Sequence, residues 1–291
     1  MIAAKLSAAV EQVTGVRVTA ARPVSGGSIA DAYDVDLSDG RRAFLKTHES
    51  LGPEVFAEEA RGLAWLAEAG AVRVPEVLAV GDERPGFLLL ERIEIARSTR
   101  DGAGEEAFGR ALAALHRFGA PSFGLSFDNH LATLTQDNSP RSSWAELYRD
   151  QRVLPLLAAA RARGLVSRGL ERDLHRLCDR MESLSGPREL PSRLHGDLWS
   201  GNRVVDTRGE SWLLDPAVYG GHREIDLAMM RLFGGFSSRV FDAYAEAFPL
   251  ADGHEGRVAL YQIYPLLAHV VMFGSGYVAQ VEDAVASALE S

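Results

Sequence analysis

The sequence contains a single cysteine, Cys178, among its 291 residues. No intramolecular disulfide can form, which fits a reducing compartment, and we expect a cytoplasmic protein. Cys178 lies at helical spacing with neighbouring leucines and a methionine. We therefore expect a buried structural thiol there in preference to a reactive one.

The chain also lacks clusters of basic residues and long uncharged apolar runs. No cluster of Lys or Arg appears, and the formal net charge is −9, from 31 basic and 40 acidic residues. A nucleic-acid-binding surface normally needs a basic patch, so we expect neither nucleic acid nor an anionic membrane as a partner. No window of about 18 uncharged apolar residues is present, so the sequence predicts no membrane-spanning helix.

The first 15 residues, MIAAKLSAAVEQVTG, are not typical of a signal peptide because charges interrupt them. They predict an amphipathic helix whose apolar face carries Ile2, Leu6, Val10 and Val13. Across the whole chain 46% of residues are hydrophobic and 24% are charged. That composition can bury one large core or two linked lobes.

Residues 16–47 predict short strands, and Asp39-Gly40 between two of them predicts a hairpin. Residues 53–69 have helical periodicity, and two further strands are expected near 76–81 and 86–91. These segments predict a β-rich first lobe that contains one important helix.

After residue 100 helical patterns dominate, including long runs over 144–163 and 169–184. A β-rich segment interrupts them at 203–215, and helices resume at residue 222. We predict an α+β fold with two lobes. Residues 1–91 form a small antiparallel nucleotide-binding lobe, and residues 92–291 form a larger, mainly helical catalytic and substrate lobe.

The segment LHGDLWSGN, residues 194–202, carries the strongest functional signal. It has the spacing H-x-D-x-x-x-x-N of kinase catalytic loops, in which the Asp accepts the substrate hydroxyl proton and the Asn binds magnesium. Asp197 is therefore the candidate base and Asn202 a candidate ligand of Mg²⁺. Asp215 ends a strand-like run and is the expected second ligand, since Mg²⁺ prefers oxygen donors.

A kinase also needs a cation on the phosphates of ATP. Lys46 lies in the strand-like run AFLKT, and Glu59 lies between Phe56 and Leu63 on the apolar face of the 53–69 helix. A carboxylate aimed at a core is costly unless it is paired. We predict that Lys46 and Glu59 form an ion pair that positions the nucleotide and supports catalysis.

Further nucleotide contacts are expected from Gly26, Gly27 and Ser28, because glycines let backbone amides approach phosphates closely. This pair of glycines is also compatible with an ordinary hairpin turn. Glu91, where the two predicted lobes join, is included among the expected nucleotide-binding residues.

With these motifs, the chain resembles the fructosamine kinase (ketosamine 3-kinase) family from about Val24 to Tyr277. More distantly it is similar to aminoglycoside and choline kinases. The strings that carry the resemblance include GGSIADAY, FLKT, LHGDLWSGN, DPAVYGGHREIDLAMMRLFGGF and LYQIYPLLAHVVMFGSGY. The resemblance implies a protein-kinase-like fold and Mg-ATP-dependent phosphorylation of the 3-hydroxyl of a ketosamine, either a small molecule or one linked to a protein.

The resemblance also implies the roles given above to the catalytic, magnesium and phosphate-binding residues. Several family members have a cysteine where this chain has Ser28, so a disulfide-linked dimer through that loop is not expected. Four residues are substrate candidates: Trp199, Tyr219, His222 and His269. Trp199 could stack on a sugar or simply pack, whereas for His269 the residues favour a hydrogen-bonded core histidine over a substrate contact. Asp226 and His195 are expected to support the catalytic loop.

Three alternatives stay open. The substrate could be another small alcohol, such as an aminoglycoside or a choline-like molecule. His195, Asp197, Asp215, His222 and Asp226 could instead bind metal ions in a hydrolase. That reading leaves Lys46, Glu59 and Asn202 without a role. An inactive binding module is disfavoured because all the polar positions of a kinase are occupied by suitable residues.

Overall fold

The computed structural model describes residues 3–24, 30–96 and 102–290. The chain divides into two compact units. Unit 1 comprises Met1–Asp101 and Arg203–Ala217, and unit 2 comprises Gly102–Asn202 and Val218–Ser291. The sequence placed the boundary after residue 91 and assigned residues 203–217 to the second lobe. The structure corrects that assignment, because this segment packs with unit 1.

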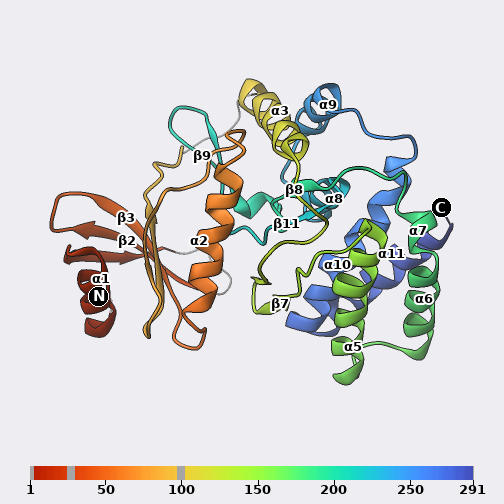
Figure 1. Ribbon diagram of the computed structural model, residues 1–291, viewed down its shortest axis with the longest axis horizontal. Coiled ribbons are helices and arrows are strands. Elements are labelled where there is room, and N and C mark those ends of the chain that lie inside the picture. Colours follow the sequence, from red (N-terminus) through yellow and green to blue (C-terminus); the bar gives the residue numbers. More distant parts are fainter. Residues whose placement is uncertain (1–2, 25–29, 97–101, 291) are drawn as a thin grey trace. The chain divides into compact units, whose positions relative to one another are not determined.

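Unit 1 is built on an antiparallel sheet (Figure 1). Its five strands have the order β1-β2-β3-β5-β4. Gly40 has φ +86° in the turn between β2 and β3, which confirms the predicted hairpin. The strands also confirm the expected pair near 76–81 and 86–91. Their bounds are β1 Val18–Pro23, β2 Asp31–Leu37, β3 Arg42–Thr47, β4 Val77–Gly81 and β5 Phe87–Glu91.

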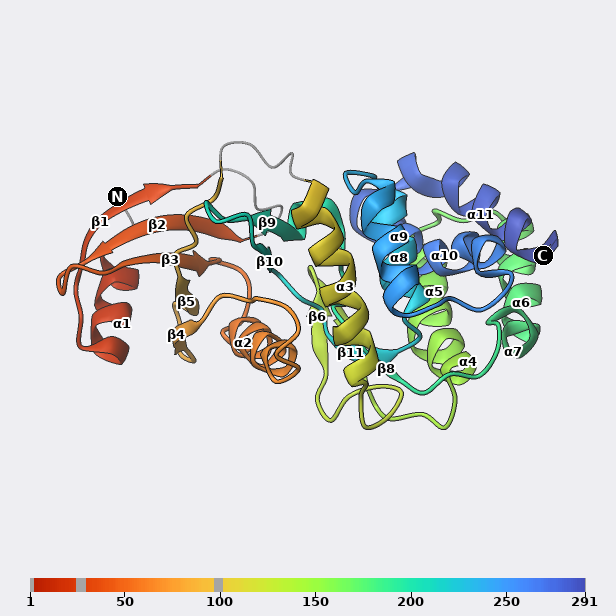
Figure 2. The ribbon, with the colours of Figure 1, turned by 90° about the horizontal axis from the view of Figure 1, so that it is seen from above.

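One helix covers each face of this sheet (Figure 2). Helix α1, Ala4–Thr14, buries Leu6 and Val10 against one face, although Val13 of the predicted apolar stripe is exposed. Helix α2, Glu54–Ala67, packs on the other face. Because side chains alternate along a strand, Leu45 of β3 points toward α1, and Lys46 points toward α2.

The segment 203–217 forms a small hairpin of β9, Arg203–Val205, and β10, Ser211–Leu213. Two isolated bridges join it to the rest of unit 1, one from Trp212 to Arg73 and one from Asp206 to Ile95. The hairpin therefore brings Asp215, which follows β10, into the same unit as β3 and α2.

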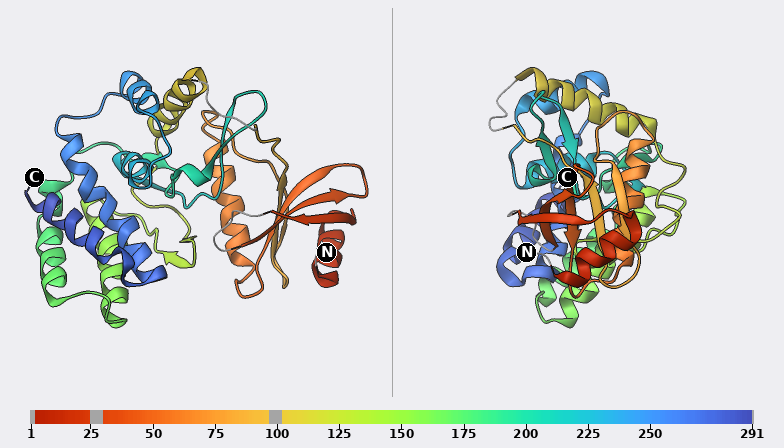
Figure 3. Two further views of the ribbon diagram at one scale, coloured as in Figure 1. Left: turned by 180° about the vertical axis from the view of Figure 1, so that it is seen from behind. Right: turned by 90° about the vertical axis from the view of Figure 1, so that its left-hand side faces the viewer.

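Unit 2 is mainly helical, as predicted for the region after residue 100 (Figure 3). The expected run over 144–163 is one helical stretch with a π-helical centre, and Cys178 is buried, with its pKa raised by burial to about 12. Helix α10 packs against α5, α8 and α11, and α3 packs against α9. The helices are α3 Gly102–Phe118, α4 Trp144–Leu147, η1 Tyr148–Val153, α5 Leu154–Ala162, α6 Arg168–Asp179, α7 Met181–Leu184, η2 Ser200–Asn202, α8 Glu224–Leu232, α9 Ser238–Ala247, α10 His254–Phe273, η3 Ser275–Tyr277 and α11 Val278–Glu290.

Two short antiparallel pairs lie within unit 2: β6, Asn129–Leu131, with β7, Leu134–Gln136, and β8, Ser192–Leu194, with β11, Tyr219–Gly221. Strand β8 leads directly into the segment 195–202 that carries the predicted catalytic residues. Among the residues that the structure describes, no helix is long and apolar enough to cross a membrane.

Candidate active site

Unit 1 contains a compact charged cluster of Lys46, Glu59 and Asp215. The Lys46 Nζ lies 2.7 Å from both carboxylate oxygens of Glu59 and 2.9 Å from Oδ1 of Asp215. The predicted ion pair is therefore present, and Asp215 joins it as a second acceptor. The side chains of Lys46 and Glu59 are only 10% and 13% exposed, whereas that of Asp215 is 49% exposed.

The local folding of each segment explains this cluster. Lys46 lies on the α2 face of β3, and Glu59 shares the side of α2 that buries Phe56 and Leu63. Asp215 has φ +52°, a left-handed conformation that is uncommon for a residue with a side chain. Unusual backbone conformations of this kind concentrate at functional positions.

The electrostatics of the cluster favour a charged lysine. Burial alone would lower the pKa of Lys46, but the Glu59 and Asp215 carboxylates outweigh that effect and raise it. Burial raises the pKa of Glu59, and the neighbouring Asp215 charge acts in the same direction against the attraction of Lys46. All three N–H groups of this ammonium have a carboxylate oxygen within hydrogen-bond distance, so Lys46 holds the two carboxylates together, and a phosphate oxygen would bind in exchange for one of them.

Unit 2 holds the loop with the predicted base. The Nδ2 of Asn202 donates to the backbone carbonyl of Asp197 at 2.8 Å and to its Oδ2 at 3.0 Å. The backbone N–H of Asn202 donates to the carbonyl of Trp199, and the N–H of Trp199 donates to that of Asp197. The half-buried Asp197 is thereby fixed inside a short hydrogen-bonded turn. Since the amide nitrogen of Asn202 faces Asp197, its Oδ1 is the atom suited to a cation.

The base of this loop is attached to a buried carboxylate. Oδ2 of Asp226 accepts the N–H of His195 at 2.8 Å, and Oδ1 accepts the N–H of Gly196 at 2.9 Å. Asp226 is 1% exposed; burial raises its pKa, but a neighbouring histidine and these loop contacts lower it below the ordinary value. The expectation that Asp226 binds backbone amides of the catalytic loop is confirmed. His195 is fully buried and accepts the N–H of Asp197 at 3.3 Å.

Comparison with known proteins places these features in a family. A sequence profile described as fructosamine kinase matches residues 2–291. A protein of Enterococcus faecium described as a probable ketoamine kinase is 38% identical over 264 residues, which cover 90% of this chain and 92% of that protein. A chloroplastic protein-ribulosamine 3-kinase of Oryza sativa is 35% identical over 268 residues, covering 90% and 76%.

The chain belongs to the fructosamine kinase family. A crystal structure described as a fructosamine-3-kinase, from Thermobifida fusca, has a TM-score of 0.89 and 38% identity, and covers 98% of this chain and 99% of that one. A macrolide 2'-phosphotransferase at 16% identity and TM-score 0.61 shares the fold alone. The predicted α+β protein-kinase-like fold is confirmed, and the protein is an ATP-dependent phosphotransferase that acts on hydroxyl groups.

Two of the expected substrate residues of this family member, Tyr219 and His222, lie in the interior. Tyr219 is fully buried and stacks on Trp144. The guanidinium carbon of Arg152 lies over the Tyr219 ring, 4.1 Å from its centroid. Burial raises the pKa of Tyr219 to about 12. His222 is 3% exposed and stacks on Tyr261, and burial lowers its pKa. The sequence offered both rings as substrate candidates, but the structure buries them, because β11 and the start of α8 direct them into the core.

Trp199 and His269 have other surroundings. The ring of the half-buried Trp199 lies directly over Gly201, where an added Cβ would come within 2.1 Å of it. The Nδ1 of His269 lies 2.8 Å from the carbonyl of Pro265, and burial lowers its pKa. The hydrogen bond is the one expected of a core histidine, but the side chain is only half-buried, so its substrate role stays a prediction. The ring of His269 also contacts the partly exposed Phe233.

The remaining residues expected to bind the nucleotide are Gly26, Gly27, Ser28 and Glu91. Gly26, Gly27 and Ser28 lie outside the described residues. Glu91 ends β5, where its carboxylate accepts the backbone N–H of Glu76.

The oxygen donors of Asn202 and Asp215 suit Mg²⁺, which needs few protein ligands when phosphates supply the rest. The described residues contain no group of three His, Cys, Asp or Glu side chains that could hold a metal. His222 is buried in an aromatic cluster, and both oxygens of Asp226 bind backbone amides. The hydrolase alternative therefore loses its ligand set.

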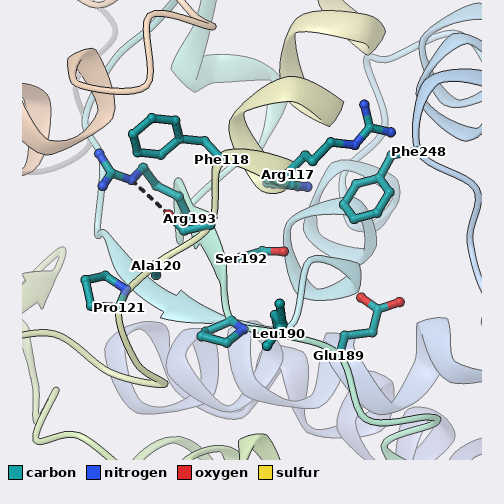
Figure 4. A pocket seen from close by; sticks show the side chains of 12 residues that line it. Arg117, Phe118, Ala120, Pro121, Glu189, Leu190, Ser192, Arg193 and Phe248 are labelled. Carbon is teal, nitrogen blue, oxygen red and sulfur yellow. Dashed lines mark hydrogen bonds between the residues drawn. The ribbon is translucent and has the colours of Figure 1, made fainter.

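Unit 2 also contains a cavity of about 680 Å³ that none of the predicted catalytic residues lines (Figure 4). It lies beside β8 and the C-terminal end of α3. Arg193 and Phe118 meet at its edge, with the guanidinium 4.6 Å from the ring centroid. The lining also includes His116, Arg117, Gly119, Ala120, Pro121, Glu189, Leu190, Pro191, Ser192 and Phe248. No pattern in the sequence indicated this cavity.

Proposed function

We propose that the protein transfers the γ-phosphoryl group of ATP to the 3-hydroxyl of a ketosamine. The observation that carries this proposal is the fixed carboxylate of Asp197, held by Asn202 in a loop that Asp226 anchors. A positioned carboxylate of this kind can accept the proton of an attacking hydroxyl as the new bond to phosphorus forms. Proton acceptance raises the nucleophilicity of the oxygen, and ADP is the leaving group.

Lys46 binds phosphate oxygens of ATP in this proposal, and Glu59 keeps the ammonium charged and oriented. Asn202 and Asp215 would hold Mg²⁺, which when bound neutralises the charge of the β- and γ-phosphates. Of the two carboxylates that contact Lys46, Asp215 is the more exposed. This supports assigning Asp215 to the metal ion and Glu59 to Lys46. Gly26, Gly27, Ser28 and Glu91 complete the proposed nucleotide site.

The substrate class is supported by the names of the relatives, a ketoamine kinase and a protein-ribulosamine 3-kinase. It is also supported by Trp199, whose half-buried ring lies two residues from the proposed base. Aromatic rings are well suited to contact the apolar face of a sugar chain. The amine portion of the substrate can be a small molecule or a protein side chain.

The experiment is product analysis by ³¹P and ¹³C NMR after incubation with ATP and either a ribulosamine or a fructosamine of the same amine. The expected product carries phosphate on the oxygen of C3. Asp197→Asn serves as the inactive enzyme, and Asp283→Asn, an exposed change of the same chemistry on α11, is the matched control. Phosphate on another oxygen, or an equally active Asp197→Asn protein, would contradict the proposal.

A further inference from the structure

His116 is a buried histidine of unit 2 for which the reaction scheme above has no role. It lies in the last turn of α3 and is 1% exposed. Its Nδ1 lies 2.8 Å from the hydroxyl of Tyr244, and its Nε2 lies 3.2 Å from Oδ2 of Asp226. The imidazole therefore bridges helix α9 and the carboxylate that anchors the catalytic loop.

The direction of these hydrogen bonds follows from chemistry. As a carboxylate, Asp226 can only accept hydrogen bonds, and its two oxygens already receive backbone N–H groups. Nε2 of His116 must then carry the proton and donate it to Asp226. In the neutral imidazole Nδ1 is an acceptor, and the hydroxyl of Tyr244 donates to it. Tyr244 thus selects the tautomer of His116 that can hold Asp226.

The contact between His116 and Asp226 matters because Asp226 also binds the catalytic loop. Its two oxygens accept hydrogen bonds from the N–H groups of His195 and Gly196, the two residues immediately before Asp197. Oδ2 accepts both the His195 N–H and the His116 Nε2–H, so the same oxygen couples the imidazole to the loop. Three hydrogen bonds therefore hold the Asp226 carboxylate in place and connect it to the loop.

We propose that His116 is a positioning residue for phosphoryl transfer, acting through Asp226 to fix the loop that carries Asp197. The inference rests on the proposed role of Asp197 as base. Without His116, Asp226 keeps its bonds to the loop but loses the partner that orients it. A displacement of about 1 Å in a reacting group can lower the rate roughly 100-fold.

The first test compares His116→Leu with His116→Gln. Leucine fills the space without a donor, whereas the amide nitrogen of glutamine can take the place of Nε2–H. His116→Leu is expected to lower kcat roughly 10- to 100-fold with little change in KM for ATP. His116→Gln is expected to recover most of kcat. Tyr244→Phe removes the group that selects the tautomer but keeps the imidazole that can donate to Asp226, so it is expected to lose less kcat than His116→Leu.

A matched control separates positioning from general loss of packing. Leu112 lies one turn earlier in α3 and is fully buried, and its apolar side chain cannot donate a hydrogen bond to Asp226. Leu112→Ala is expected to lower the melting temperature while kcat of the folded enzyme stays close to wild type. A loss of kcat in Leu112→Ala as large as that in His116→Leu would overturn the proposal, because a merely structural role would then explain both.

Backbone amide exchange provides a readout that does not depend on turnover. In His116→Leu the amides of His195 and Gly196 are expected to exchange at least about tenfold faster, with amides of α10 unchanged. Unchanged exchange at these two amides would overturn the positioning role. If the wild type phosphorylates no ketosamine, the function proposed above fails, but the exchange experiment still decides whether His116 holds the loop.

Discussion

Lys46 is expected to react with amine-directed reagents far more slowly than Lys5, which is the only other lysine in the chain. Only the uncharged amine reacts, so labelling reports the fraction of each lysine that has lost its proton. Lys5 is exposed on α1 and provides an internal reference in the same molecule. The labelling is done at pH 9, and mass spectrometry of the peptides then distinguishes both lysines from the terminal amine.

The size of the effect follows from the cluster geometry. At the 2.7 Å separation from Glu59, a unit charge pair at an effective dielectric constant of about 20 has a gross attraction of ~6 kcal/mol. Burial opposes the charged form, but the net effect raises the pKa of Lys46. Each unit of pKa lowers the reactive fraction about tenfold. Lys46 is therefore expected to label at least about tenfold more slowly than Lys5, before burial slows access further.

The two carboxylates should contribute unequally. Glu59→Gln is expected to accelerate labelling of Lys46 by roughly tenfold or more, because the buried partner is lost. Asp215→Asn is expected to have a smaller effect, since Asp215 is 49% exposed and solvent screens it. Glu54→Gln, an exposed change in the first turn of α2, is the matched control. Labelling of Lys46 as fast as Lys5 in the folded wild type, or no response to Glu59→Gln, would refute the reasoning.

Three further predictions concern the reaction. Asp197→Asn is expected to lower kcat by about 10²–10⁴-fold while affinity for ATP is retained, because only proton acceptance is lost; a wild-type kcat would remove Asp197 as base. Asp215→Ala is expected to abolish the magnesium dependence of ATP binding in calorimetry, since a carboxylate ligand is missing; unchanged affinity and full activity would exclude the metal role. Trp199→Ala is expected to raise KM for the sugar substrate with ATP affinity unchanged; unchanged KM and kcat would leave Trp199 as a packing residue over Gly201.

The sequence predicted the parts of the site that obey local rules. Alternation along a strand and the helical repeat placed Lys46 and Glu59 on facing sides, and the cost of a buried carboxylate paired them. The position of Asp215 beside Lys46 was not predictable. Those two residues are 169 positions apart, and their contact depends on how the hairpin at 203–217 docks.

The burial of two substrate candidates could not be predicted from their nearness in sequence to Asp215. Tyr219 and His222 follow Asp215 closely, but the pairing of β11 with β8 turns their rings into the core of unit 2. His116 was missed for a related reason. It continues an apolar stripe with Leu112 in α3, and a histidine there reads as ordinary core until its two partners, both more than 100 residues away, are known.

The most direct test of the central claim compares kcat/KM of the purified enzyme on a ribulosamine, a fructosamine and kanamycin, with Asp197→Asn as the blank. The account predicts measurable phosphorylation of at least one ketosamine, a much lower kcat/KM for kanamycin, and turnover by Asp197→Asn at least about 10²-fold below that of the wild type. Faster turnover of kanamycin, or no turnover of either ketosamine, would contradict the proposed substrate class.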